Sequence, residues 1–164
     1  MKKFILFLSL LFSIFQTALA QKTEIWIVRH AEKGVNNPND PDLSDKGKKR
    51  AEDLAVILAK FKFDAAFSTP YKRTHQTLDP LAKKNKISIT DYKSITTLVD
   101  DIRKNYSGKK IIIAGHSNTV LETIEAFGIQ RPKAKITDDE FNNIFHLTLN
   151  GNKTELKTNT YGKI

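Results

Sequence analysis

The stretch EIWIVRH, residues 24–30, decides the fold class of this chain. Residues 24–28 form a short, mostly apolar run with β-branched and aromatic side chains, and this pattern predicts a buried strand. The run ends at Arg29 and His30, so a guanidinium and an imidazole directly follow the predicted strand. Ligands of open α/β sheets bind beyond the carboxyl ends of the strands, so these two residues mark a first candidate site.

Helical and strand patterns alternate along the rest of the chain. Ser44 is a suitable N-cap for a helix in which apolar residues recur at helical spacing from Ala51 to Leu58. Asn150-Gly151 joins two alternating runs, 145–149 and 154–158, and predicts a hairpin. Further strands are predicted at 64–67, 87–89 and 110–114, and further helices from Pro70 to about Lys84, at 95–105, and from behind Gly115 to Phe127. The pattern predicts a three-layer α/β/α domain with a mainly parallel sheet and an antiparallel edge hairpin.

Composition narrows the possible functions. The chain has 164 residues and no cysteine, which favours one domain and excludes disulfides, a thiol nucleophile and thiolate metal sites. None of the four histidines are at i,i+4 spacing, so no metal and no cofactor are predicted. The net charge of +9 comes from dispersed lysines without interleaved aromatic residues, which argues against a nucleic-acid partner. Solvated faces, or attraction of an anionic substrate, explain the charge instead.

Residues 1–20 are predicted to be a secretory signal peptide. Lys2 and Lys3 precede an apolar segment, and Ala18-Leu19-Ala20 is a small-x-small cleavage site. An uncleaved membrane anchor is the alternative, but the apolar segment is short for a membrane span. We therefore expect a mature domain over residues 21–164 that is exported, periplasmic or secreted, and keeps no stable membrane anchor. The sequence leaves its oligomeric state open.

Polar clusters follow three of the predicted strands. Arg29-His30 follows the first, the segment 68–73 (STPYKR) follows the second, and the segment 115–118 (GHSN) follows the strand at 110–114. Two arginines, Arg29 and Arg73, and two histidines, His30 and His116, are thereby expected in one crevice. Forked guanidinium groups match phosphate oxygens, a neutral imidazole can attack phosphorus, and a protonated one can donate. The set predicts phosphoryl chemistry on a small phosphorylated substrate.

Two other enzyme classes are excluded by their motifs. The segment 115–118 lacks the glycine two places after Ser117 that a nucleophile elbow of a serine hydrolase needs. No glycine-rich loop follows the first strand, so a dinucleotide-binding fold is also excluded.

Four motifs in order resemble the histidine phosphatase superfamily, the phosphoglycerate mutase-like proteins. They are Arg29-His30-Ala31-Glu32; Leu43-Ser44 with Gly47 and Ala51; Ser68-Thr69-Pro70 with Arg73 and Gln76-Thr77; and Gly115-His116-Ser117-Asn118. The resemblance covers about residues 24–128. It implies that His30 is the nucleophile that becomes phosphorylated, and that Arg29, Arg73 and His116 complete the phosphate pocket. It also implies a reaction that needs no metal.

The chain departs from the family pattern where an acid is expected. The proton-donating carboxylate of the family usually lies between the second arginine and the second histidine, and here Asp91 is the choice among four unremarkable aspartates. Ser68, Asn118 and Asn36 are expected to help bind the substrate, and Glu32 to organise the loop behind His30. Arg73 and His116 are close in sequence, so the long lid insertion of larger members is missing.

The expected function is hydrolysis of phosphomonoesters through a phosphohistidine intermediate on His30. Protonated His116 and the two arginines would stabilise the charge that develops on the phosphoryl group. One alternative is a phosphatase that acts on phosphohistidine in proteins, whose nitrogen leaving group depends less on a strong acid. A second alternative is a non-catalytic phosphate- or anion-binding module with the same fold.

Overall fold

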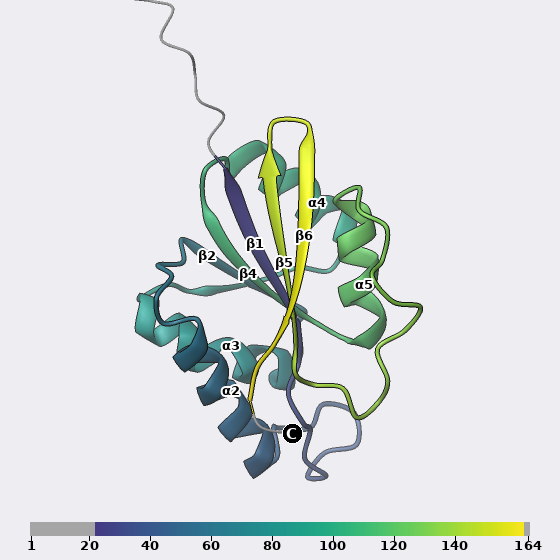
Figure 1. Ribbon diagram of the computed structural model, residues 1–164. Helices are drawn as coiled ribbons and strands as arrows, with labels where there is room; N and C mark the ends of the chain where they lie inside the picture. The colour runs from purple at the N-terminus through teal and green to yellow at the C-terminus, as the bar shows by residue number, and fades with distance from the viewer. Residues whose placement is uncertain (1–21, 163–164) are drawn as a thin grey trace, which may run out of the picture.

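The computed structural model describes residues 22–162, which form one sheet with helices on both sides (Figure 1). The predicted signal peptide lies outside the described residues. Within the described part of the chain, no helix is both long and apolar enough to cross a membrane. In chain order the elements are β1 (Thr23–Arg29), α2 (Asp45–Ile57), β2 (Ala65–Ser68), α3 (Lys72–Asn85), β3 (Ile89–Asp91), α4 (Ile95–Asn105), β4 (Lys110–Gly115), α5 (Ser117–Ala126), β5 (Asn143–Asn150) and β6 (Lys153–Thr160).

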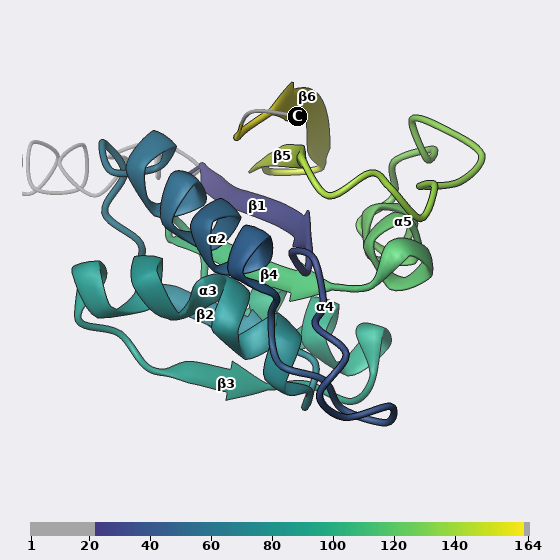
Figure 2. The same ribbon diagram turned by 90° about the horizontal axis from the view of Figure 1, so that it is seen from below.

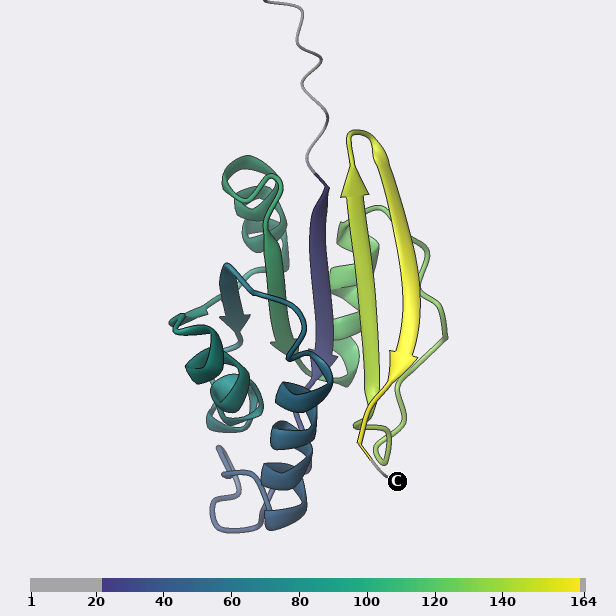
Figure 3. The ribbon, with the colours of Figure 1, turned by 60° about the vertical axis from the view of Figure 1, so that its left-hand side comes forward.

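The sheet has the order β3-β2-β4-β1-β5-β6. β3, β2, β4 and β1 run parallel, whereas β5 is antiparallel to β1 and β6 is antiparallel to β5. The hairpin therefore forms one edge of the sheet beside β1 (Figure 3). This arrangement confirms the predicted fold class.

Both faces of the parallel strands are covered by helices. α2 and α3 lie on one face, and α4 and α5 on the other (Figure 2). The residues of β1 alternate between the two cores: Ile25 and Ile27 pack with the residues of α4 and α5, while Trp26 and Val28 pack with those of α2 and α3. The apolar run that predicted a buried strand is thus explained by burial on both faces.

Two predicted boundaries were wrong. Pro70 lies before α3 rather than in its first turn, because Tyr71 has an extended backbone (φ −128°, ψ 143°) and is the N-cap. The third strand begins at Ile89 rather than Ile87. Lys86 ends α3 in a left-handed conformation (φ 56°), and the N–H of Ile87 still donates to the carbonyl of Ala82. The helix cap therefore uses the residues expected to start the strand.

The pairing register places the carboxyl ends of the parallel strands at the same edge of the sheet. Arg29 pairs with Gly115, and Ser68 pairs with both Ala114 and Asp91. Because β5 is antiparallel, its first residues lie at this same end, and Ile144 pairs with Val28. The segment before β5, residues 130–142, is here called the strap. It leads from the side of α5 to the carboxyl ends of the parallel strands (Figure 1).

Candidate active site

His30 lies directly beyond β1 and is held in one orientation. Its backbone N–H donates to the carbonyl of Gly115, and its ring Nδ1 lies 2.8 Å from the carbonyl oxygen of Ala31. A carbonyl can only accept, so Nδ1 carries the proton and Nε2 keeps a free lone pair. The side chain is buried, and burial lowers its pKa to about 4, helped by the nearby positive charges of Arg29 and Arg73. His30 is therefore neutral at pH 7.

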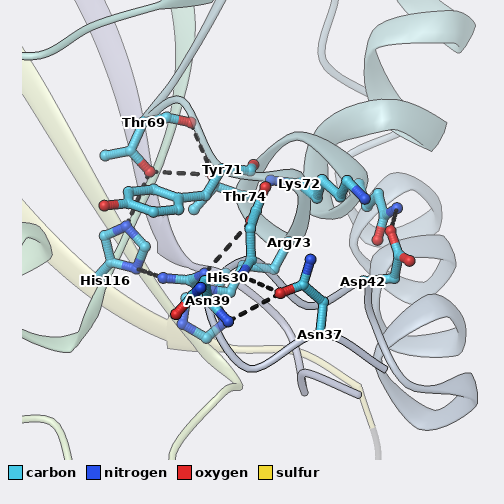
Figure 4. A network of polar contacts seen from close by, with 12 residues as sticks. His30, Asn37, Asn39, Asp42, Thr69, Tyr71, Lys72, Arg73, Thr74 and His116 are labelled. Carbon is cyan, nitrogen blue, oxygen red and sulfur yellow. Dashed lines mark hydrogen bonds and ion pairs between the residues drawn. The ribbon is translucent and has the colours of Figure 1, made fainter. Parts of the chain in front are cut away.

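His116, the N-cap of α5, and Arg73, in the first turn of α3, lie beside His30 (Figure 4). The rings of His30 and His116 are 5.3 Å apart and nearly perpendicular, and Arg73 Nη2 is 3.4 Å from His116 Nδ1. Burial, followed by the charges of Arg73 and Arg29, lowers the pKa of His116 to about 4. The ring of His116 is therefore neutral at pH 7 before substrate binds, mainly because it is buried and also because two guanidinium groups oppose a third positive charge. The protonated His116 expected during the reaction stays a prediction.

A chain of hydrogen bonds fixes the tautomer of His116. The Thr74 hydroxyl lies 2.8 Å and 2.9 Å from the carbonyls of Tyr71 and Thr69, so it donates to one of these. The Thr69 hydroxyl then donates to Thr74 (3.0 Å) and accepts from His116 Nε2, also at 3.0 Å (Figure 4). The proton of neutral His116 is consequently on Nε2, and Nδ1 faces Arg73.

Arg29 connects the pocket to the strap. Its Nη1 donates to the carbonyls of Thr137 (2.7 Å), Asp138 (3.3 Å) and Glu140 (3.1 Å), and its Cζ is 4.3 Å from the centre of the Phe141 ring. Burial lowers its pKa, an effect that the strap carboxylates oppose, but a guanidinium remains charged at neutral pH. Its Nε is buried and has no hydrogen-bond partner within the described residues. A buried donor of this kind suits an anionic ligand.

Arg29, His30 and Arg73 line a cavity of about 390 Å³, whereas His116 is not among its lining residues. Its lining carries charges of both signs, with Arg29, Arg73 and Lys33 positive and Asp138 negative. Among residues 22–162, Asp138 is the one carboxylate residue that lines it. The lining residues are Arg29, His30, Lys33, Pro38, Asn39, Pro41, Arg73, Asp138 and Phe141. Among residues 22–162, no three histidine, aspartate or glutamate side chains gather as a metal site would require.

The loop behind His30 is fixed to α2, as expected for Glu32. The Glu32 carboxylate accepts from Nε and Nη2 of Arg50 at 2.7–2.9 Å, and the Glu32 carbonyl accepts from the backbone N–H of Ser44. Burial alone would raise the pKa of Glu32, but the hydrogen bonds and charge of Arg50, a backbone hydrogen bond and the charge of Lys46 together hold it below its usual value. Gly47 permits this contact, because a Cβ there would lie 2.2 Å from the Glu32 carbonyl oxygen.

The expectation for Asp91 is corrected. β3 is the edge strand, separated from β1 by β2 and β4, so the two backbones are about 14 Å apart at the usual strand spacing. The Asp91 carboxylate pairs instead with Nε2 of His75 at 2.5 Å, and it does not line the cavity of His30.

The three further binding residues are corrected as well. Ser68 is fully buried, and its hydroxyl donates to the carbonyl of Thr69. Asn118 is exposed in the first turn of α5 and does not line the cavity. Asn36 closes its own loop through two hydrogen bonds with Asp42. Each lies near a motif residue in sequence, but its side chain points elsewhere or is already engaged.

Sequence reasoning did not predict the roles of Thr69, Asp138 and Phe141. Thr69 stands inside a quoted motif, so its proximity to the second histidine was a usable signal. The two strap residues carry no motif. Only the antiparallel hairpin indicates them, because it returns the chain to the site.

The fold and the pocket define a class: three-layer α/β proteins with two histidines and two arginines at the carboxyl ends of parallel strands. The sequence model of the histidine phosphatase superfamily (branch 1) matches residues 25–96. Over these residues, which include His30 and Arg73, the chain is similar to this superfamily.

One curated protein is similar to part of the chain in sequence, and solved structures share its fold. Phosphoserine phosphatase 1 of Hydrogenobacter thermophilus is 38% identical over 69 residues, which are 38% of this chain and 33% of that protein. The chain thus matches about a third of the length of this curated relative. The protein histidine phosphatase SixA complexed with tungstate has a TM-score of 0.69 at 14% identity, covering 84% of this chain and 96% of SixA. Phosphoserine phosphatase of Entamoeba histolytica has a TM-score of 0.65 at 15% identity, covering 87% and 98%.

Proposed function

We propose that this chain is a phosphatase that hydrolyses phosphomonoesters through a phosphohistidine intermediate on His30. The observation that carries the proposal is the state of His30: a buried, neutral imidazole whose Nδ1 proton is held by a carbonyl, between two guanidinium groups. This arrangement leaves Nε2 as a nucleophile in a pocket that attracts phosphate.

In the first step, the Nε2 lone pair of His30 forms a bond to phosphorus while the ester P–O bond breaks. Arg29 and Arg73 both line the cavity and offer their guanidinium groups to the phosphate. Forked donors of this type stabilise the equatorial oxygens as their charge develops. A phosphate dianion between the arginines would also favour protonation of His116 at Nδ1, the nitrogen that faces Arg73. Water then breaks the P–N bond and regenerates neutral His30.

The test compares His30→Ala with His75→Ala. The second variant removes a histidine that pairs with Asp91 outside the pocket. With p-nitrophenyl phosphate, His30→Ala should retain less than about 1% of wild-type turnover, because loss of a covalent nucleophile costs several kcal/mol. His75→Ala should stay within about twofold. After rapid quenching, the wild-type protein should carry covalently bound phosphate that is labile in acid and stable in alkali. His30→Ala should carry none. Turnover by His30→Ala above that level would overturn the proposal.

The same assay separates the two alternatives. A phosphohistidine-protein phosphatase would hydrolyse a phosphohistidine peptide and leave alkyl phosphates untouched. A non-catalytic module would show one burst of phosphorylated His30 without turnover, or binding of inorganic phosphate alone.

We also propose that the protein is a compact, exported member of the superfamily. The N-terminal segment has the features of a signal peptide, and cleavage after Ala20 would leave the domain from residue 21. Export and cleavage can be tested by expressing the full chain in a Gram-negative bacterium, fractionating the cells, and sequencing the N-terminus of the product. A periplasmic or secreted product that begins at Gln21 supports the proposal, and an uncleaved cytoplasmic product overturns it.

A further inference from the structure

The pocket needs a group that protonates the leaving oxygen of an ester, because an alkoxide is a poor leaving group. His30 is the nucleophile of the proposed reaction, and the arginines do not release protons. Asp91 is paired with His75 and lies three strands away from β1. Asp40 contacts Arg73 at 3.7 Å, and its Oδ1 also accepts the backbone N–H of Lys72.

Asp138 differs from these carboxylates in its position. It lines the cavity together with His30 and Arg73, and it is exposed to solvent. No hydrogen bond or ion pair to its carboxylate is found among the described residues, whereas the neighbouring carboxylate of Asp139 accepts the hydroxyl of Thr137.

The backbone around Asp138 is held by the pocket itself. Arg29 donates to the carbonyls of Thr137, Asp138 and Glu140, three positions within four residues of the strap. Phe141 adds a cation–π contact with the same guanidinium. The guanidinium that would bind phosphate therefore also holds the backbone of the segment that carries the acid.

We propose that Asp138 is the general acid and base of this site, an inference that rests on the proposed phosphatase function. In the first step, the Asp138 carboxyl gives its proton to the ester oxygen as the P–O bond breaks and the His30 Nε2–P bond forms. The products are a neutral alcohol, phosphorylated His30 and the Asp138 carboxylate. In the second step, the carboxylate takes a proton from the attacking water as the P–N bond breaks, which returns inorganic phosphate, neutral His30 and protonated Asp138.

The experiment compares two substrates whose leaving groups differ. A simple alkyl phosphate needs protonation of its oxygen, whereas p-nitrophenolate leaves largely unaided. Asp138→Asn should lower kcat/KM for the alkyl phosphate about 100-fold, within the usual contribution of general acid catalysis, and for p-nitrophenyl phosphate less than about tenfold. The Asn side chain leaves the backbone carbonyl that binds Arg29 unchanged.

Two matched controls make the result specific. Asp139→Asn removes the adjacent strap carboxylate, and Asp91→Asn removes the acid favoured by position in sequence; both should keep the wild-type ratio of the two substrates. An equal effect of Asp138→Asn on both substrates, or none, would overturn the assignment while the phosphatase function stands. A wild-type protein that turns over neither substrate and forms no phosphohistidine would overturn the function itself.

Discussion

Replacement of Arg50 by methionine tests how the core supports the site. The substitution keeps the apolar stem and removes the guanidinium that binds both carboxylate oxygens of Glu32. The side chains of Arg50 and Glu32 are only 6% and 12% exposed, so the substitution leaves a carboxylate that is nearly buried. Breaking a buried pair in this way costs about 3–5 kcal/mol. Lys46 remains 3.5 Å from the Glu32 carboxylate, but its side chain is 67% exposed and compensates little. We therefore expect the free energy of unfolding to fall by about 3 kcal/mol.

Urea unfolding measures this loss directly. Trp26 is the single tryptophan of the chain, is 2% exposed, and reports on the core through its fluorescence. With an m-value of about 2 kcal/mol/M, the midpoint should fall by about 1.5 M at unchanged slope. The Glu32→Gln/Arg50→Met double variant should lose at least about 1 kcal/mol less than the sum of the single variants, because the uncompensated charge is absent.

Two results would refute the reasoning. One is a loss below about 1 kcal/mol for Arg50→Met, and the other is strict additivity in the double variant. If Arg50→Met fails to fold, Arg50→Lys keeps the charge without the fork and should show an intermediate midpoint. A wild-type midpoint for Arg50→Lys would then remove the forked geometry from the explanation.

Three other predictions follow from the contacts of the site. The folded-state pKa values of about 4 for His30 and His116 lie below the unfolded value of about 6.5. The contribution of these histidines to the free energy of unfolding should therefore be full above pH 6.5. It should decrease as the pH falls toward 4, by up to about 1.4 kcal/mol per pH unit for each histidine. In His30→Asn, the urea midpoint should depend less on pH than in the wild type. Gly47→Ala, which in an exposed helix would stabilise by about 1 kcal/mol, should instead destabilise because its Cβ meets the carbonyl of Glu32; a raised midpoint would contradict this. Thr69→Val removes the hydroxyl that fixes the tautomer of His116, so the pattern of ring ¹⁵N shifts should change and kcat should fall more than KM rises. Thr69→Ser keeps the hydroxyl and should restore the ¹⁵N pattern and kcat.

Local features of the fold were predictable because they depend on neighbouring residues. Ser44 caps α2 as expected, since its hydroxyl accepts the N–H of Gly47 at 3.1 Å. Asn150 ends β5 and pairs with Lys153, and Gly151 in the two-residue turn supplies the positive φ, 58°, that a tight hairpin requires. The alternation of strands and helices likewise follows from side-chain periodicity. These predictions needed no knowledge of which strands are adjacent.

Asp91 shows why the order of strands could not be predicted in the same way. Asp91 does end a parallel strand at the same end of the sheet as His30, which is what the sequence indicated. The sheet order places that strand at the edge, next to β2, and this order depends on how the helices pack rather than on a local pattern. His75 is one turn into α3 and faces Asp91, so the carboxylate pairs with it. Position along a strand was correct, and position across the sheet was not.

The strap shows a second reason why part of the site could not be predicted from the sequence. Its position follows from the topology of the sheet, but its residues carry no motif. A hairpin added antiparallel to β1 must begin at the carboxyl end of β1, and the register of Val28 with Ile144 shows that it does. Any segment that enters this hairpin from α5 has to pass the mouth of the pocket. Arg29 then binds the carbonyls of that segment rather than its side chains. A backbone contact of this kind holds the strap in place whatever its sequence, so the side chain at position 138 is free to determine the chemistry of the leaving group.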